Sequence, residues 1–125
     1  KTWRNKKTGM VGSYTPEKTV NFENLAKSRA HDAGAVIMEG PLRMIVRAYW
    51  PMKGTPYKRG RRRETYKVTR PDGDNVLKSV ADSLNGICYR DDAQIVEATI
   101  SKRHAGQYDS ARTIVVIEEI KDDLL

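Results

Sequence analysis

The pattern of residues 70–102 constrains the fold of this chain more than any other stretch. It begins with an acidic turn, continues through an amphipathic segment to a break at Asn85-Gly86, and ends in an alternating run. The apolar residues of the amphipathic segment recur with the period of a helix; they are Val76, Leu77, Val80, Ala81 and Leu84. Asp74 is a suitable N-cap for this helix, and Gly86 suits its C-terminal end. The stretch therefore predicts a helix followed by a strand.

Residues 94–101 alternate polar and apolar side chains, as expected for a half-buried strand. One acidic pair, Asp72 and Asp74, precedes the predicted helix, and a second pair, Asp91-Asp92, precedes the predicted strand. If the helix packs on the strand beside it, we expect the two pairs to converge.

Convergent carboxylates are the ligands that a hard divalent cation such as Mg²⁺ prefers. Without a cation, neighbouring carboxylates would repel one another. Lys78, one helical turn after Asp74, could neutralise a phosphate or the charge that develops during phosphoryl transfer. The spacing does not suit an EF-hand, because Val76 and Leu77 occupy the fifth and sixth positions, where that loop needs an oxygen ligand and a glycine.

Composition favours a nucleic-acid partner. The 125 residues carry 23 Lys and Arg against 16 Asp and Glu, a formal net charge of +7. Such a balance suits DNA, RNA or an anionic membrane, but no apolar run approaches membrane-spanning length and no signal peptide is visible. The single cysteine, Cys88, is expected to be a packed apolar side chain, and His31 and His104 have no metal-ligand spacing. We expect one soluble intracellular domain spanning residues 1–125.

The remaining segments predict an α/β (α+β) domain. A helix is expected from Thr15-Pro16 to Gly34, and strands are expected over residues 42–50 and 112–120, the second buried on both faces. The turn-rich, basic residues 1–14 are expected to form a loop or arm, either touching phosphates or solvated. This order of elements predicts a small mixed sheet with two main helices packed on it.

Residues 58–63 carry five positive charges in six positions. Such a run repels itself and is expected to be mobile until phosphates neutralise it. The alternative is a solvated loop. The residues predicted to bind DNA are Lys58, Arg59, Arg61, Arg62, Arg63, Arg70 and Lys78.

The ordered motifs of the central stretch resemble the RusA family of Holliday-junction resolvases, small endodeoxyribonucleases often carried by phages and prophages. They cover about a third of the chain, and the Tyr14-Thr15-Pro16 helix start also resembles the family. The motifs are Asp72-Gly73-Asp74-Asn75, then Lys78, then Asp82-Ser83-Leu84-Asn85-Gly86, then Asp91-Asp92-Ala93-Gln94-Ile95.

The resemblance implies site residues. Asp72, Asp74 and Asp92 would bind Mg²⁺, with Mn²⁺ able to substitute and Asp91 as a further candidate ligand. Lys78 would also be needed for catalysis. Asn75 and Asp82 match the family pattern in secondary roles, and Asp82 would orient Lys78 from one helical turn away.

The resemblance also implies paired symmetric nicks in four-way junction DNA during recombination and repair. Two related cuts need two active sites, which favours a C₂ homodimer. We expect no small-molecule cofactor and no membrane partner, and we expect a cytoplasmic, nucleoid-associated protein of bacterial or phage origin.

Family members open with a strand that precedes the region where this chain begins, so we expect that strand to be missing. Two other functions stay open: a non-catalytic basic nucleic-acid-binding module, and a metal-dependent nuclease without junction preference. Taken singly, each acid also has a structural alternative, as a helix cap or a solvated turn.

Overall fold

The computed structural model describes residues 2–5, 10–13 and 19–121, and side-chain environments from residue 26 onward. Within these ranges the predicted α+β class is confirmed, and the two predicted helices and three predicted strands follow in the predicted order. The short strands β1, β2 and β4 were not predicted. The elements are β1 (Thr2–Asn5), β2 (Met10–Ser13), α1 (Thr19–Asp32), β3 (Leu42–Trp50), β4 (Thr65–Tyr66), α2 (Gly73–Ser83), the 3₁₀ turn η1 (Asp92–Gln94), β5 (Ile95–His104) and β6 (Arg112–Glu119).

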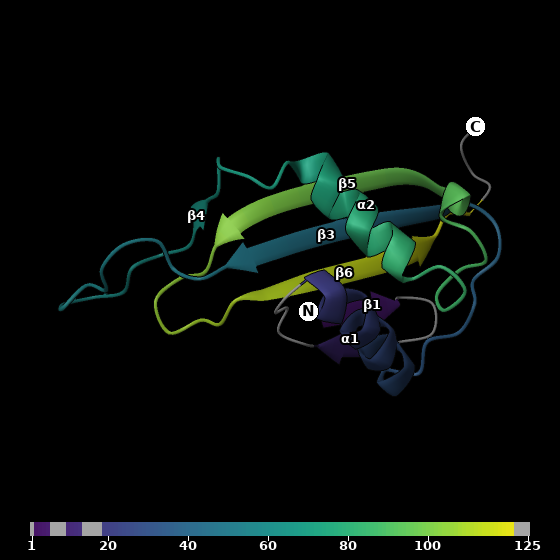
Figure 1. The fold of residues 1–125 in the computed structure, drawn as a ribbon, viewed down its shortest axis with the longest axis horizontal. Helices are drawn as coiled ribbons and strands as arrows, with labels where there is room; N and C mark the ends of the chain where they lie inside the picture. The colour runs from purple at the N-terminus through teal and green to yellow at the C-terminus, as the bar shows by residue number, and fades with distance from the viewer. Residues whose placement is uncertain (1, 6–9, 14–18, 122–125) are drawn as a thin grey trace.

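The six strands form one mixed sheet in the order β2-β1-β6-β3-β5-β4 (Figure 1). The central strand β3 runs parallel to β5 and antiparallel to β6. In this register Met44 lies opposite Ala98 on one side and Ile117 on the other. The middle of the sheet thus presents one apolar stripe to a single face.

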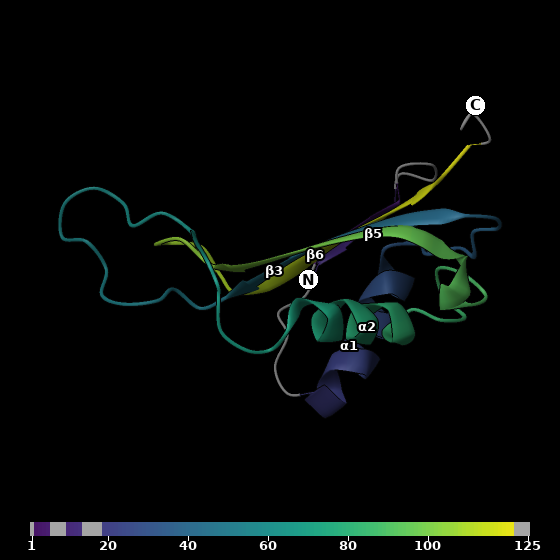
Figure 2. The ribbon, with the colours of Figure 1, turned by 90° about the horizontal axis from the view of Figure 1, so that it is seen from above.

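Both helices pack on that face (Figure 2). The core between the helices and the sheet is made of side chains that are almost fully buried. Burial of each of the larger ones contributes about 1.5–3 kcal/mol of hydrophobic free energy. The core side chains include Ala26, Ala30, Met44, Val46, Val80, Leu84, Val115 and Ile117. The helices therefore fix the position of the turn before α2 and of the turn before β5.

The opposite face of the sheet carries no helix in the described part of the chain (Figure 2). Ile114 and Val116 of β6 lie on this face and are only half-buried. The prediction that this strand is buried on both faces was therefore wrong, because the two helices cover one face alone.

The prediction of a loop or arm over residues 1–14 was also wrong for the residues that the structure describes. Residues 2–5 and 10–13 form an antiparallel hairpin, and β1 pairs in parallel with β6. The backbone groups along the outer side of β6 need hydrogen-bond partners, and a short hairpin supplies them. The predicted helix start at Thr15-Pro16 lies outside the described residues, and the described helix begins at Thr19.

Helix α2 begins two residues earlier than predicted. Asp72, not Asp74, is its N-cap, and the Val76 amide donates to the Asp72 carbonyl at 3.1 Å. A Cβ at Gly73 would lie 3.2 Å from Ile100 Cγ2, so the glycine lets the start of α2 approach β5 closely. None of the described helices is long and apolar enough to cross a bilayer.

Candidate active site

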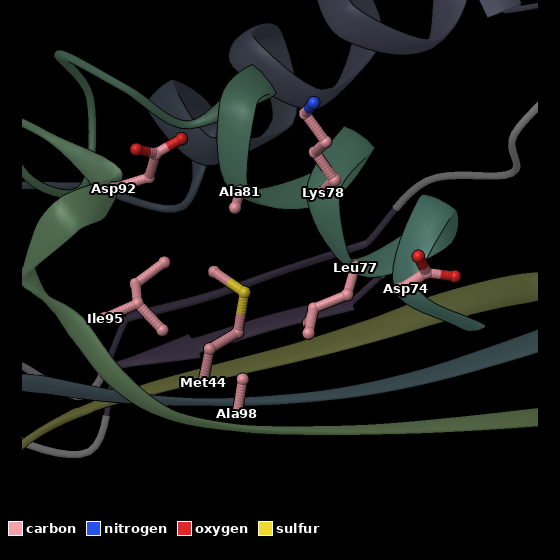
Figure 3. A pocket seen from close by; sticks show the side chains of 8 residues that line it. All are labelled: Met44, Asp74, Leu77, Lys78, Ala81, Asp92, Ile95 and Ala98. Atoms are coloured by element: carbon pink, nitrogen blue, oxygen red, sulfur yellow. The ribbon is translucent and has the colours of Figure 1, made fainter.

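A groove of about 260 Å³ runs between α2 and the start of β5 (Figure 3). Its floor is apolar, and three charged residues of the predicted site stand around it: Asp74, Lys78 and Asp92. The floor residues are Met44, Leu77, Ala81, Ile95 and Ala98. The packing of α2 on the sheet thus brings the two acidic motifs to one surface feature.

The two carboxylates stand at opposite ends of this groove (Figure 3). Asp74 lies in the first turn of α2, whereas Asp92 accepts a long hydrogen bond of 3.4 Å from Asn85, just after the last turn. The distance along the helix from Asp74 to Ser83, its last residue, is about 14 Å at 1.5 Å per residue. The acids therefore face one groove without meeting at one point.

This separation corrects the expected convergence. The described residues contain no group of three or more His, Cys, Asp or Glu side chains that could hold a metal ion. Asp72 does not line the groove. The physical reason is the length of α2, which separates the turn that precedes it from the turn that follows it.

Asp72 is the N-cap of α2, yet its side chain makes no capping hydrogen bond. Asp72 and Asp74 are both exposed, and neither carboxylate has a hydrogen-bond or ion-pair partner among the described residues. Helix capping therefore does not account for these two side chains, which are available to a cation.

Asp91 is committed to local structure instead. Its carboxylate accepts from the Ala93 amide at 2.9 Å, and the Gln94 side chain accepts from the Asp91 amide at 3.2 Å, which completes a capping box. Gln94 Nε2 also donates to the carbonyls of Met38 and Gly40. Gln94 thus fixes the turn that carries Asp92, a role that the sequence motif did not reveal.

Tyr89 and Cys88, shortly before this turn in the sequence, are both fully buried. The Tyr89 hydroxyl donates to the Ala81 carbonyl at 2.5 Å. Burial raises the pKa of Tyr89, and Cys88 and the negative charges of Asp92 and Asp82 add to the effect. Burial also raises the pKa of Cys88 to about 12. Cys88 is fully buried, which confirms that it is a packed apolar side chain.

The turn before α2 is held by a residue that the sequence interpretation missed. Lys102 Nζ donates to the Thr69 carbonyl at 2.7 Å and to the Pro71 carbonyl at 2.6 Å. These carbonyls flank Arg70 and immediately precede Asp72. The strand β5 thereby positions both acidic turns. Lys102 holds the turn before Asp72, and the amide of Ile95, the first residue of β5, donates to the Asp92 carbonyl.

The Lys78 ammonium points away from the groove floor (Figure 3). In the described part of the chain no ion pair joins Lys78 to Asp82, so no contact supports the predicted role of Asp82 in orienting Lys78. Asn75 and Asp82 are exposed and do not line the groove.

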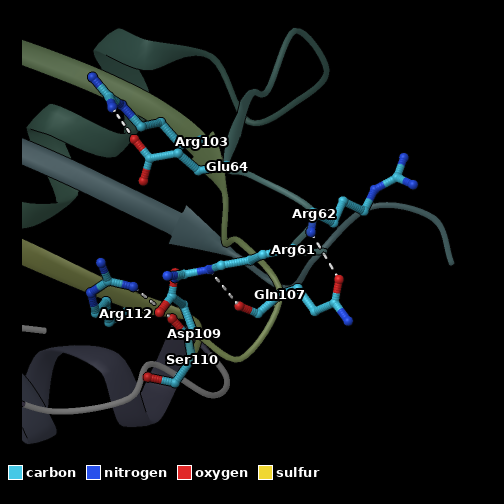
Figure 4. A network of polar contacts seen from close by, with 8 residues as sticks. All are labelled: Arg61, Arg62, Glu64, Arg103, Gln107, Asp109, Ser110 and Arg112. Atoms are coloured by element: carbon cyan, nitrogen blue, oxygen red, sulfur yellow. Dashed lines mark hydrogen bonds and ion pairs between the residues drawn. The ribbon is translucent and has the colours of Figure 1, made fainter. Parts of the chain in front are cut away.

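The predicted DNA-binding run lies away from the groove, in the long connection between β3 and β4 (Figure 1). It does not form a free, self-repelling loop as expected. Arg61 and Arg62 contact Gln107 in the connection between β5 and β6 (Figure 4). Arg70 is exposed and lies two residues before Asp72.

The family model described as Endodeoxyribonuclease RusA matches residues 1–118. The chain belongs to the RusA family. It is also 30% identical over 121 residues to the uncharacterized protein YqaN of Bacillus subtilis (strain 168), covering 91% of this chain and 83% of that protein. RusA proteins are endodeoxyribonucleases that act on junction DNA and generally depend on a divalent metal ion.

The groove suits such an ion in its donor chemistry but not as a three-carboxylate cage. Hard cations prefer carboxylate oxygens, and Mg²⁺ is commonly held by one or two carboxylates together with waters and substrate phosphates. Asp72 and Asp74 supply two such carboxylates at one end of α2. Asp92 lies at the other end, so the described arrangement does not place all three predicted ligands around one ion.

Proposed function

We propose that this chain is a Mg²⁺-dependent endodeoxyribonuclease that resolves four-way Holliday junctions by paired symmetric nicks during recombination and repair. The observation that carries the proposal is the groove between α2 and β5, which Asp74, Lys78 and Asp92 all line, in a chain of the RusA family.

The proposed roles are based on the side chains that make no hydrogen bond or ion pair within the described residues. Asp72 and Asp74 are exposed carboxylates without partners among the described residues, and we assign them to metal binding. A bound Mg²⁺ would supply an activated water and offset charge at the scissile phosphate. Lys78 extends from the same face of α2 and would hold a phosphate oxygen through its ammonium. Asp92 lies at the other end of the groove, and we do not assign it to the same ion.

The proposed substrate agrees with the charge of the chain. A formal net charge of +7 attracts DNA over a long range. The exposed position of the groove would let a phosphodiester backbone reach the carboxylates without unfolding of the protein. Arg70 lies next to the acidic turn and would offset the repulsion between its carboxylates and an incoming strand.

We further propose a C₂ homodimer, because two symmetric cuts in one junction need two active sites related by a two-fold axis. Light scattering on the free protein checks this state, with a mass near twice the 14.2 kDa of one chain as the expected result. A mass of one chain, both free and junction-bound, would contradict it.

The substrate proposal is tested with a synthetic four-way junction and a linear duplex of matching sequence, each incubated with the protein and Mg²⁺ or with EDTA. We expect symmetric nicks in the junction alone and none in EDTA. Cutting of both DNAs would remove the junction preference and leave a general metal-dependent nuclease. Tight binding without cutting would leave a non-catalytic binding module.

A further inference from the structure

The connection between β3 and β4, residues 51–64, extends past the ends of the central strands (Figure 1). We call these residues the basic finger. They carry six Lys and Arg against one acid, Glu64. A projecting segment of this charge would be expected to lack a fixed shape unless something holds it.

Gln107, in the connection between β5 and β6, holds the basic finger from inside. Its side chain is 6% exposed. Its Oε1 accepts from the backbone amides of Tyr57 at 3.1 Å and Arg62 at 2.8 Å, and its Nε2 donates to the Tyr57 carbonyl at 3.1 Å and the Tyr108 hydroxyl at 3.2 Å. One buried amide thus binds both arms of the finger at once.

The backbone around Gln107 adds to these contacts between the finger and the β5–β6 connection. The Gln107 amide donates to the Arg62 carbonyl at 2.8 Å. A Cβ at Gly106 would lie 3.0 Å from Asp109 Oδ2 and 3.2 Å from the Glu64 amide nitrogen, so the glycine lets the two connections approach closely without displacing these atoms. The finger and the β5–β6 connection therefore form one packed unit.

Two of the cations in the finger are used for its own structure (Figure 4). Arg61 donates to the Gln107 carbonyl at 3.1 Å and forms an ion pair with Asp109 at 2.5 Å. Arg62 donates to the Thr55 carbonyl at 3.1 Å and lies 5.1 Å from the centre of the Tyr57 ring. These two side chains are stabilising parts of the finger and are poorly placed to contact a ligand as well.

Four other cations of the finger remain available, and three of them lie within six positions of one another. Lys58, Arg59 and Arg63 are exposed and have no ion-pair or hydrogen-bond partner among the described residues. The nearby acids do not neutralise them, because Glu64 is paired with Arg103 and Asp109 is paired with Arg61. The finger therefore presents these three unneutralised charges, together with the exposed Lys53 nearer its start, on a frame of fixed shape.

The finger is far from Asp92. β5 begins at Ile95, close to Asp92, and ends at His104, which pairs with Thr65 at the base of the finger. Nine steps along a strand span about 30 Å at 3.3 Å per residue. That length corresponds to about 9 base pairs of duplex at 3.4 Å per base pair.

We propose that Gln107 locks residues 51–64 into a rigid basic finger, and that Lys58, Arg59 and Arg63 hold the phosphates of a duplex arm beyond the end of β5, at least about one helical turn away from Asp92. The inference rests on the proposed function, since the arm belongs to the DNA that the groove would cut. It divides the predicted basic run into cations that build the finger and cations that touch DNA.

The test measures binding in EDTA, so it does not depend on cleavage. Fluorescence anisotropy would compare junctions whose hairpin-closed arms have about 5 or about 15 base pairs, which end before or beyond the finger. Replacing Lys58, Arg59 and Arg63 with Gln is expected to lower affinity for the long-arm junction alone. The slope of log K against log salt should become shallower by about 2.7, at 0.9 per phosphate contact.

Gln107→Met removes the hydrogen bonds of the lock while keeping the length of the side chain. We expect about a tenfold loss of affinity for the long-arm junction, because the cations then lose their fixed positions. Little change is expected for the short-arm junction. The matched control replaces three exposed cations elsewhere, Lys27, Arg29 and Lys121, with Gln and should leave the advantage of long arms intact.

Three results would overturn the inference. The Gln107→Met protein could bind both junctions like the unaltered protein, or it could lose affinity for both to the same degree. The control triple variant could match the finger variant. Junction cleavage that persists in any of these cases would leave the proposed function standing. A finger that binds long arms in a protein that never cuts would contradict the proposed function alone.

Discussion

Asp74 and Asp92 face one groove from opposite ends of helix α2. The turn that carries Asp74 is anchored by Lys102, and the turn that carries Asp92 is anchored by Gln94. The two ends of the candidate site are therefore separate structural units that mutations can disturb one at a time.

The first prediction separates Asp72 from Asp91, two acids that precede regular elements. Asp91→Ala removes a capping hydrogen bond and should lower the free energy of unfolding by about 1 kcal/mol. Asp72→Ala removes no such bond and should leave stability nearly unchanged while cleavage is lost. Urea denaturation and junction cleavage measure the two effects. Equal destabilisation by both substitutions would show that Asp72 is only a cap.

The second prediction concerns Lys102, which we regard as a positioning residue for the acidic turn. Lys102→Met keeps the length of the side chain but leaves the Thr69 and Pro71 carbonyls without their donor. We expect kcat for junction cleavage to fall by about 10- to 100-fold because the turn is displaced. Affinity for the junction should change little.

A conservative replacement separates positioning from general destabilisation. Lys102→Arg keeps a cationic donor and should recover part of the lost kcat, whereas Lys121→Met, on an exposed residue, should have no effect. If Lys102→Met weakened binding and cleavage in parallel and Lys102→Arg restored neither, the positioning role would be wrong.

The third prediction is a pH dependence of stability. Burial raises the pKa of Cys88 from 9.0 to about 12 in the folded chain. Between these values the unfolded chain releases the thiol proton and the folded chain keeps it, so unfolding becomes easier as the pH rises. The free energy of unfolding should fall by up to about 1.4 kcal/mol per pH unit above pH 9.

Cys88→Ala tests this linkage. Removing the thiol should flatten the decline between about pH 9 and pH 10, before the neighbouring tyrosine, whose pKa is also raised, contributes in the same direction. Stability at neutral pH should drop modestly, since a small cavity replaces the sulfur. An unchanged slope in the Cys88→Ala protein would contradict the assignment.

The helices and strands with a clear period could be predicted from the sequence. The strand at residues 42–50 and the apolar face of α2 follow from local patterns, because burial on one side imposes a period on the side chains. The hairpin β1–β2 could not be predicted in this way. It forms where β6 offers hydrogen-bonding partners, and the identity of that neighbour is set by the whole fold.

The acidic motifs of the candidate site could be identified from the sequence, but not their geometry. Spacing placed Asp74 and Lys78 on one helix, yet only the packing of α2 shows that Asp92 lies at the far end of the groove. Lys102 and Gln107 carry no motif. Their roles arise from contacts with backbone carbonyls and amides more than 30 positions away in the chain, which side-chain patterns do not encode.

The most direct test of the account is junction cleavage by Asp74→Asn, with binding measured on the same DNA. Asp32→Asn, at the exposed end of α1, is the matched control. We predict that Asp74→Asn abolishes the Mg²⁺-dependent nicks and binds the junction as well as or better than the unaltered protein, because a negative charge is removed. The control should cut normally. Full cleavage by the Asp74→Asn protein would contradict the claim that the groove between α2 and β5 is the active site.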